Sequence, residues 1–188
     1  MEALLVIDVQ PGFGWTDQLS DVESREQRLV GRNIVGALSR YRALDKKVIF
    51  VVLPGLENPI PAGQNILEPW LICNSGIYDA KLPKFLCHKH SPFESVFVKF
   101  WANAFENLEL APHLHCDGVT DLYLAGCCTS ACVMSTAVGA VQNGFNVFLM
   151  ADCSYPMFAD KQEQTEWLDE VTATVPKQHQ EKLRIGII

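Results

Sequence analysis

Short runs of apolar, β-prone residues recur along this 188-residue chain and are separated by stretches with helical spacing. The runs are Ala3 to Val9, Lys47 to Leu53, Ser95 to Lys99, Leu122 to Ala125 and Asn146 to Met150. They do not alternate between apolar and polar residues, which is typical of strands buried on both faces of a parallel sheet. Because parallel strands need long crossover connections, this pattern predicts helices packed over the sheet.

The intervening stretches carry the expected helical signals. Between the first two runs, apolar residues repeat at helical spacing: Val30, Ile34, Leu38 and Tyr41. They predict an amphipathic helix over about Ser24 to Leu44. A second helix is predicted from Ser130 to Asn143, and it ends at Gly144, which suits the left-handed conformation just past a helix end. Further on, Asp160 to Glu170 fit a helix and Lys182 to Ile188 fit a last strand.

The chain suits one domain. Pro54 to Pro92 holds most of the prolines and little periodicity, so we expect an irregular excursion over the mouth of the sheet. No repeat, low-complexity tract or linker divides the sequence, and 48% hydrophobic residues are ample for one core. We therefore predict a single α/β domain over residues 1–188. Its architecture is a three-layer, doubly wound, mostly parallel sheet with helices on both faces.

Composition excludes several classes of function. Fifteen basic and 22 acidic side chains give a net charge of −7, and no Lys/Arg stretch is dense enough to follow a phosphate backbone. The N-terminus lacks the basic start and cleavage site of a signal peptide, and no window reaches the roughly 20 apolar residues of a membrane span. We expect a cytoplasmic homo-oligomer that binds a small molecule, with no nucleic-acid or membrane partner. Its seven unpatterned cysteines are interpreted as free thiols.

Three chemically active residues fall at predicted strand ends. In an open parallel sheet, ligands collect at the carboxyl ends of the strands. Asp8 ends the first predicted strand, Lys99 ends the third, and Gly126 to Cys132 joins the fourth to its helix. Singly, these residues fit ordinary roles: a loop cap, a solvated strand end and a small buried hydrophobe. Together they predict one site, because buried charges are costly unless they serve one another.

Cys132 is the candidate nucleophile. It begins the predicted helix, where unpaired N–H groups and the helix dipole favour thiolate over thiol, and Lys99 adds positive charge. We therefore expect a lowered thiol pKa. Cys127 and Cys128 in the turn, and Cys153 after a different strand, are expected to be structural.

The histidines do not form an established metal motif. Cys87, His88 and His90 are close in sequence, and His113 alternates with His115, but neither group has the spacing and second ligand cluster of a zinc site. We interpret them as scattered surface residues.

Three segments resemble the isochorismatase-like cysteine hydrolases, in the same order as in that family. They are LLVIDVQPGF with Asp8 and Gln10, VFVKFWANAF with Lys99, and GVTDLYLAGCCTSACVMSTAVGAVQNGFNVFLMADCS with the nucleophile. In the last segment the family's G-x-x-T-x-x-C-V pattern reads Gly126, Thr129, Cys132 and Val133. The resemblance runs from Leu4 to about Asp152.

The resemblance implies a mechanism. Asp8 would be the general base that takes the thiol proton, Cys132 the nucleophile and Lys99 the charge that holds both in place. A thioacyl intermediate would form and be hydrolysed by water. Members that cleave the vinyl ether of isochorismate typically lack this cysteine, so its presence favours cleavage of the carbon–nitrogen bond of an amide, ureide or carbamoyl compound.

The resemblance also implies the surroundings of the thiol. Phe13 and Trp70 would form aromatic walls, with Trp101 and Phe105 as further candidates, although core packing is the alternative for Phe105. A cis peptide bond between Cys127 and Cys128 is expected. With it, the N–H groups of Cys128 and Cys132 would form an oxyanion hole.

The chain departs from its metal-binding relatives. Nicotinamidases are similar to it around Trp70 and Cys73, but they carry an Asp-x-His and further histidines that bind a metal. This chain has VVLPGLENPIPAG there and no histidine between Met1 and Cys87. We therefore expect no metal and no cofactor. Two alternatives remain open: a catalytically idle binding or interaction protein, and a redox protein using the adjacent Cys127 and Cys128, although no C-x-x-C is present.

Overall fold

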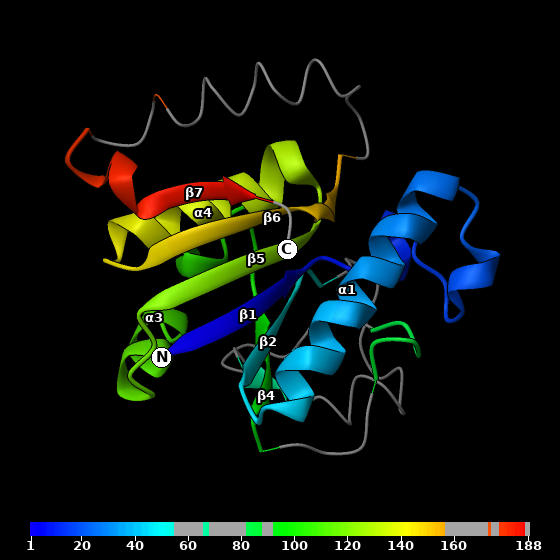
Figure 1. Cartoon of the computed structure of the whole chain (residues 1–188), viewed down its shortest axis with the longest axis horizontal. Coiled ribbons are helices and arrows are strands. Elements are labelled where there is room, and N and C mark those ends of the chain that lie inside the picture. The colour runs from blue at the N-terminus through cyan, green and yellow to red at the C-terminus, as the bar shows by residue number, and fades with distance from the viewer. Residues whose placement is uncertain (55–65, 68–81, 88–91, 157–172, 174–176, 187–188) are drawn as a thin grey trace.

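The computed structural model describes residues 1–54, 66–67, 82–87, 92–156, 173 and 177–186 (Figure 1). Within these residues the sheet has seven strands in the order β3-β4-β2-β1-β5-β6-β7. Every neighbouring pair is parallel except β3 and β4. The strands are β1 Glu2–Ile7, β2 Lys47–Val52, β3 Ile66–Leu67, β4 Glu94–Val98, β5 Asp121–Cys127, β6 Asn146–Tyr155 and β7 Leu183–Gly186. The predicted mostly parallel, doubly wound sheet is confirmed.

The apolar runs form the strands that they predict. β1 lies between β2 and β5 and is buried from Ala3 to Ile7. Because β1 has a strand on each side and a core on each face, its sequence shows no alternation of apolar and polar residues. The sequence predicts that β6 ends at Met150, but the strand extends to Tyr155. The short antiparallel β3 was not predicted, since two residues carry no readable period.

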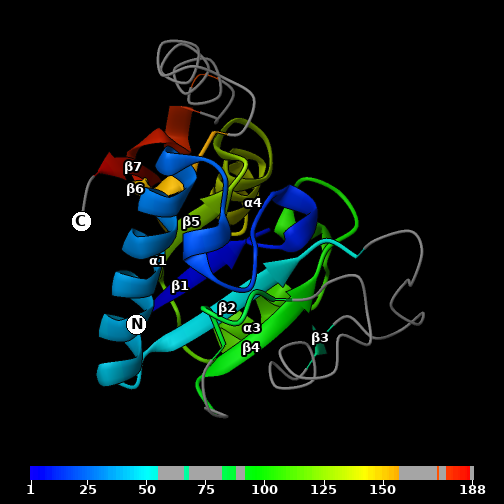
Figure 2. The same ribbon diagram turned by 90° about the vertical axis from the view of Figure 1, so that its right-hand side faces the viewer.

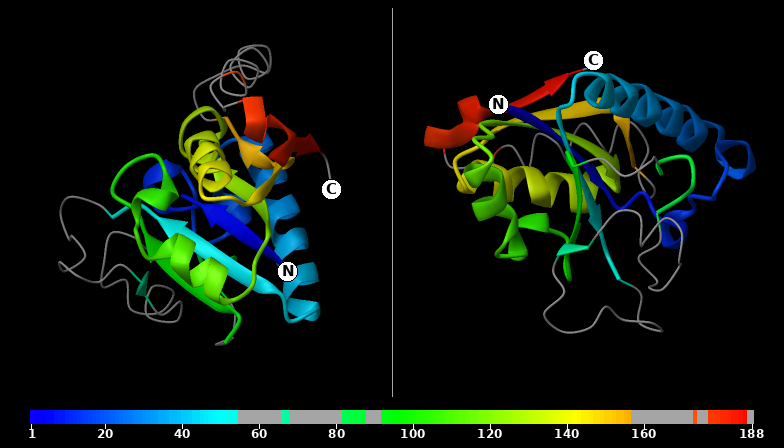
Figure 3. Two further views of the ribbon diagram at one scale, coloured as in Figure 1. Left: turned by 90° about the vertical axis from the view of Figure 1, so that its left-hand side faces the viewer. Right: turned by 90° about the horizontal axis from the view of Figure 1, so that it is seen from below.

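Helices cover both faces of the sheet (Figures 2 and 3). Side chains of β1 alternate between two cores. Leu4 and Val6 pack with Ile34 of α1 (Arg25–Ala43), whereas Leu5 and Ile7 pack with residues of α3 (Leu110–Cys116) and α4 (Met134–Gln142). The three-layer arrangement therefore follows from the two-residue repeat of the strands.

A serine cap marks the start of α1, and a glycine with positive φ lies just past the end of α4. The Ser24 hydroxyl accepts a hydrogen bond from Gln27 N at 3.2 Å and starts α1. α4 is preceded by a π-helical turn, Thr129–Val133, and is followed by Gly144 with a φ of 93°. α3 was missed because only Leu110 and Leu114 carry its apolar face. The predicted helix Asp160 to Glu170, and most of the excursion from Pro54 to Pro92, lie outside the described residues.

The cysteines do not all match the expectation of free thiols. Cys87 is disulfide-bonded, so that expectation is wrong at this position. A disulfide depends on how close two Cβ atoms come in the fold and not on spacing along the chain, which is why the irregular pattern concealed it. The cysteines outside disulfides include Cys116, Cys127, Cys128, Cys132 and Cys153. None of the described helices has the length and apolarity needed to cross a bilayer.

Candidate active site

Three side chains from three strand ends meet at one edge of the sheet. Asp8 directly follows β1, Lys99 directly follows β4, and Cys132 lies in the π-helical turn after β5. Lys99 Nζ is 2.8 Å from Asp8 Oδ2 and 3.3 Å from Cys132 Sγ. The structure therefore brings together the carboxylate, ammonium and thiol that the sequence singled out.

The Lys99 ammonium is fully engaged. Its third contact is a hydrogen bond to Trp101 O at 2.9 Å, so the carboxylate, the thiol and this carbonyl surround the ammonium. The side chains of Lys99 and Asp8 are both completely buried. The Asp8–Lys99 contact is therefore a buried ion pair. Each charge lies beside its counter-charge, which offsets part of the cost of burying it.

The main chain around Asp8 is held by β2. Asp8 has a left-handed φ of 52°, a conformation that non-glycine residues adopt only where their surroundings hold it. Its N–H donates to Val51 O at 2.9 Å. Two residues later, the Gln10 amide donates to Leu53 O at 2.9 Å and accepts from Leu53 N at 2.8 Å. The Gln10 side chain thus continues the β1–β2 ladder past the end of β1 and fixes the direction of the chain at Asp8.

Gly126 lets the thiol turn approach Asp8. Its φ is 125°, and a Cβ there would lie 2.0 Å from Ile7 O. Only glycine allows β5 to pass this close to the end of β1. This close approach places the start of the turn that leads to Cys132 next to Ile7, the residue before Asp8.

The turn before Cys132 is built from two buried cysteines. The Cys127–Cys128 peptide bond is cis, as predicted. The Cys128 thiol donates to Pro156 O at 2.7 Å. Cys128 O accepts from Ala131 N at 3.1 Å and from Val133 N at 3.2 Å. Among the described residues, the Cys128 N–H has no main-chain acceptor.

The electrostatics correct one sequence-based expectation. Burial raises the pKa of Asp8 above its ordinary value of 3.8, although Lys99 opposes the shift. Burial, followed by the Asp8 charge, raises the pKa of the Cys132 thiol to about 11, again against Lys99. The expected lowered thiol pKa is therefore wrong, because the argument from the helix N-terminus left out desolvation and the carboxylate. The two shifts favour the neutral thiol over the thiolate and make the Asp8 carboxylate more basic than an ordinary aspartate.

The predicted pocket aromatics lie in different surroundings. Phe13 is in the short turn Pro11–Phe13, partly buried against the α1-side core. Trp101 has 74% of its surface exposed, whereas Phe105 is buried in the opposite core, with its ring 5.7 Å from that of Phe145. This placement favours the core-packing alternative for Phe105. Trp70 lies outside the described residues.

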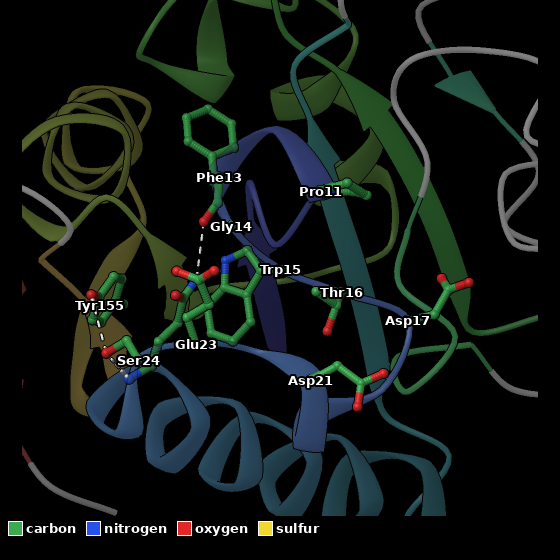
Figure 4. A pocket seen from close by; sticks show the side chains of 11 residues that line it. Pro11, Phe13, Gly14, Trp15, Thr16, Asp17, Asp21, Glu23, Ser24 and Tyr155 are labelled. Carbon is green, nitrogen blue, oxygen red and sulfur yellow. Dashed lines mark hydrogen bonds between the residues drawn. The ribbon is translucent and has the colours of Figure 1, made fainter.

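A cavity of about 840 Å³ lies between the segment after β1 and the start of α1 (Figure 4). Its lining includes aromatic rings and carboxylates, namely Trp15, Tyr155, Asp17, Asp21 and Glu23. Asp8, Lys99 and Cys132 are not among its described lining residues. Tyr155 pairs with Cys127 in the sheet, so one end of the cavity adjoins the turn that leads to the thiol.

No metal centre is found in the described part of the chain, where no group of three or more His, Cys, Asp or Glu residues could hold an ion. His113 lies against Lys47 at the amino end of β2, and the His115 ring stacks on Phe145 at 4.5 Å. His88 and His90 are outside the described residues. Metal independence remains a prediction.

Sequence reasoning missed the residues that support this arrangement. Thr136, on α4, accepts a hydrogen bond from Ala104 N at 3.0 Å and joins the segment after Lys99 to the helix after Cys132. No sequence signal marks Thr136, because it is one small polar residue among several in the predicted helix. The Trp101 carbonyl also had no signal, because a main-chain contact does not depend on residue type.

Comparison with known proteins identifies the family of the chain. A family model described as isochorismatase domain matches residues 2–176. A maleamate amidohydrolase from Pseudomonas putida is 41% identical over 70 residues, which are 37% of this chain and 33% of the relative. An uncharacterised isochorismatase family protein from Bacillus subtilis is 35% identical over 71 residues, 38% and 39% of the two chains. The matches therefore span only about a third of each curated relative.

Solved structures share the fold over nearly the full length. A pyrazinamidase from Pyrococcus horikoshii, solved in complex with zinc, has a TM-score of 0.69 at 19% identity. The match covers 100% of this chain and 99% of that chain. N-carbamoylsarcosine amidase from Thermoplasma acidophilum has a TM-score of 0.67 at 16% identity, with 99% of this chain and 95% of that chain covered. At these identities the similarity establishes the three-layer fold.

Proposed function

Because the chain belongs to the isochorismatase family, we propose that it is a cysteine hydrolase that cleaves a carbon–nitrogen bond in a small amide, ureide or carbamoyl compound. The observation that carries the proposal is the Lys99 ammonium, which contacts both the Asp8 carboxylate and Cys132 Sγ. A nucleophile, a base and a fixed positive charge are the groups that acyl transfer to a thiol requires.

The first half-reaction starts from the neutral thiol. Asp8, whose raised pKa makes it a stronger base than an ordinary aspartate, takes the thiol proton as Sγ attacks the carbonyl carbon. Lys99 balances the negative charge throughout. The carbonyl oxygen becomes an oxyanion, and the N–H groups of Cys128 and Cys132 are its proposed donors. The carbon–nitrogen bond then breaks, and Asp8 returns the proton to the leaving nitrogen.

The second half-reaction releases the acid. Asp8, again ionised, takes a proton from a water molecule as the water oxygen attacks the thioester carbon. The carbon–sulfur bond breaks, and the sulfur regains its proton from Asp8. The products are ammonia or an amine and a carboxylic or carbamic acid, and the side chains return to their starting state.

The names of the similar proteins agree with this reaction class. They include an amidohydrolase and an N-carbamoylsarcosine amidase. The idle-protein alternative does not explain why Asp8 and Lys99 are completely buried beside a thiol, where replacement by apolar residues is often neutral or stabilising.

Ammonia release from a panel of small amides, ureides and carbamoyl compounds tests the proposal. We expect release from at least one class by the wild-type protein and none by Cys132→Ala. Cys116→Ala is the matched control, because Cys116 is an exposed thiol outside the site. Turnover that persists in Cys132→Ala would overturn the proposed mechanism. A folded wild-type protein that hydrolyses no member of the panel would favour the idle alternative.

A further inference from the structure

The segment that follows Lys99 is attached to the helix that follows Cys132. Lys99 Nζ donates to Trp101 O at 2.9 Å, so the position of this segment determines one of the three contacts of the ammonium. Three residues later, Ala104 N donates to Thr136 Oγ1 at 3.0 Å. Thr136 is completely buried and Ala104 nearly so.

Close packing reinforces this connection. A Cβ on Gly139 of α4 would lie 2.3 Å from Asn103 Oδ1, so the helix and the segment are in direct contact. Asn103 Oδ1 in turn accepts from Phe105 N at 2.9 Å. At the other end, the Asn107 amide donates to Val98 O at 2.7 Å, the residue before Lys99. The segment is thus fixed to β4 and to α4.

We propose that Thr136 is a positioning residue that sets the relation between the Lys99 ammonium and the Cys132 thiol. The inference rests on the proposed function. The Thr136 hydroxyl is the acceptor that holds the main chain after Lys99 against the nucleophile helix. Without it, the Ala104 N–H is a buried donor with no acceptor, and the segment shifts to find one. Trp101 O then moves away from Lys99 Nζ, the ammonium is no longer held 3.3 Å from Cys132 Sγ, and it stabilises the thiolate less.

The test measures the thiol and needs no substrate. The rate of Cys132 alkylation by iodoacetamide is followed against pH by peptide mass spectrometry, in wild type, Thr136→Val and Thr136→Ser. Valine keeps the shape of threonine and removes the hydroxyl, whereas serine keeps the hydroxyl. We expect the alkylation profile of Thr136→Val to move upward by about one pH unit, which is about a tenfold lower rate below the thiol pKa. Thr136→Ser is expected to follow the wild-type profile.

Two further variants separate positioning from general loss of stability. Gly139→Ala displaces the Asn103 side chain while keeping the Thr136 hydroxyl, so it is expected to shift the profile in the same direction, even if Thr136→Val fails to fold. Val141→Ala removes apolar bulk from the same helix and the same core, and it is expected to lower the melting temperature without moving the profile.

The outcomes are distinct from those of the function test. A wild-type profile in both Thr136→Val and Gly139→Ala would overturn the positioning role, whatever the protein hydrolyses. A shifted profile in Val141→Ala would also overturn it, because ordinary destabilisation would then explain the effect. Failure of the proposed function would appear instead as turnover in Cys132→Ala or no ammonia release, with the alkylation results unaffected.

Discussion

Replacing Lys99 by Met tests how the buried charges depend on one another. The change keeps the length and apolar bulk of the side chain but leaves the Asp8 carboxylate without its partner at 2.8 Å. Breaking a buried pair in this way costs about 3 to 5 kcal/mol of folding free energy. The loss should depend on pH, because a protonated Asp8 no longer needs a counter-charge.

The size of the pH effect follows from the ordinary Asp8 pKa of 3.8. Keeping Asp8 protonated costs about 1.4 kcal/mol for each pH unit above that value, hence about 6 kcal/mol at pH 8 and about 2 kcal/mol at pH 5. The penalty in Lys99→Met is therefore limited to about 2 kcal/mol at pH 5 but reaches the full 3 to 5 kcal/mol at pH 8. In Lys99→Met the pKa of Asp8 is higher in the folded than in the unfolded protein, so folding stability is lost as pH rises above 3.8.

Urea unfolding of wild type, Lys99→Met and the double variant Asp8→Asn/Lys99→Met at both pH values measures this coupling. Asn has nearly the shape of Asp and no charge, so the double variant should regain most of the stability lost at pH 8. An equal loss at pH 5 and pH 8, or a double variant no more stable than Lys99→Met at pH 8, would show that the Asp8 charge is not the cause of the loss.

Two other predictions follow from the site geometry. Asp8→Asn should lower kcat/KM about 10²- to 10⁴-fold, because a neutral amide cannot take the thiol proton. In the wild type, the acid limb of the pH–rate profile should lie above pH 3.8, since the base form of Asp8 is lost as pH falls through its raised pKa. An acid limb at or below pH 3.8 would contradict this role. Gly126→Ala should lower the melting temperature sharply and abolish activity, because the new Cβ would lie 2.0 Å from Ile7 O. Gly144→Ala is its control in calorimetry, with a positive φ of 93° but open space around the Cβ. Equal losses in both variants would implicate the backbone angle instead of the contact.

The sheet and the meeting of the three side chains were predictable from sequence. Strands buried on both faces appear in the sequence as continuous apolar runs, and the polar residues Asp8 and Lys99 lie where such runs end. The rule that parallel strands present their carboxyl ends at one edge then brings both residues to the turn before Cys132. The roles assigned to these residues remain proposals.

The thiol pKa and the supporting contacts were not predictable. The pKa of Cys132 depends on how completely Asp8, Lys99 and the thiol are buried. This burial is set by the packing of many segments of the fold. The Trp101 carbonyl and the Cys87 disulfide depend on distances between segments, and these leave no periodic signal in the sequence. Thr136 appears as one more helical residue until the structure places it against Ala104 N.

Mass spectrometry of a rapidly quenched reaction can detect the proposed thioacyl intermediate on Cys132. With a substrate identified by ammonia release, the wild-type protein is mixed with excess substrate, quenched in acid within the first turnovers, digested and mapped. We expect the peptide containing Cys132 to gain the mass of the acyl group. Cys132→Ala should show neither this adduct nor turnover, while Cys116→Ala should show both. An acyl group on any other residue, or undiminished ammonia release by Cys132→Ala, would contradict the proposed intermediate.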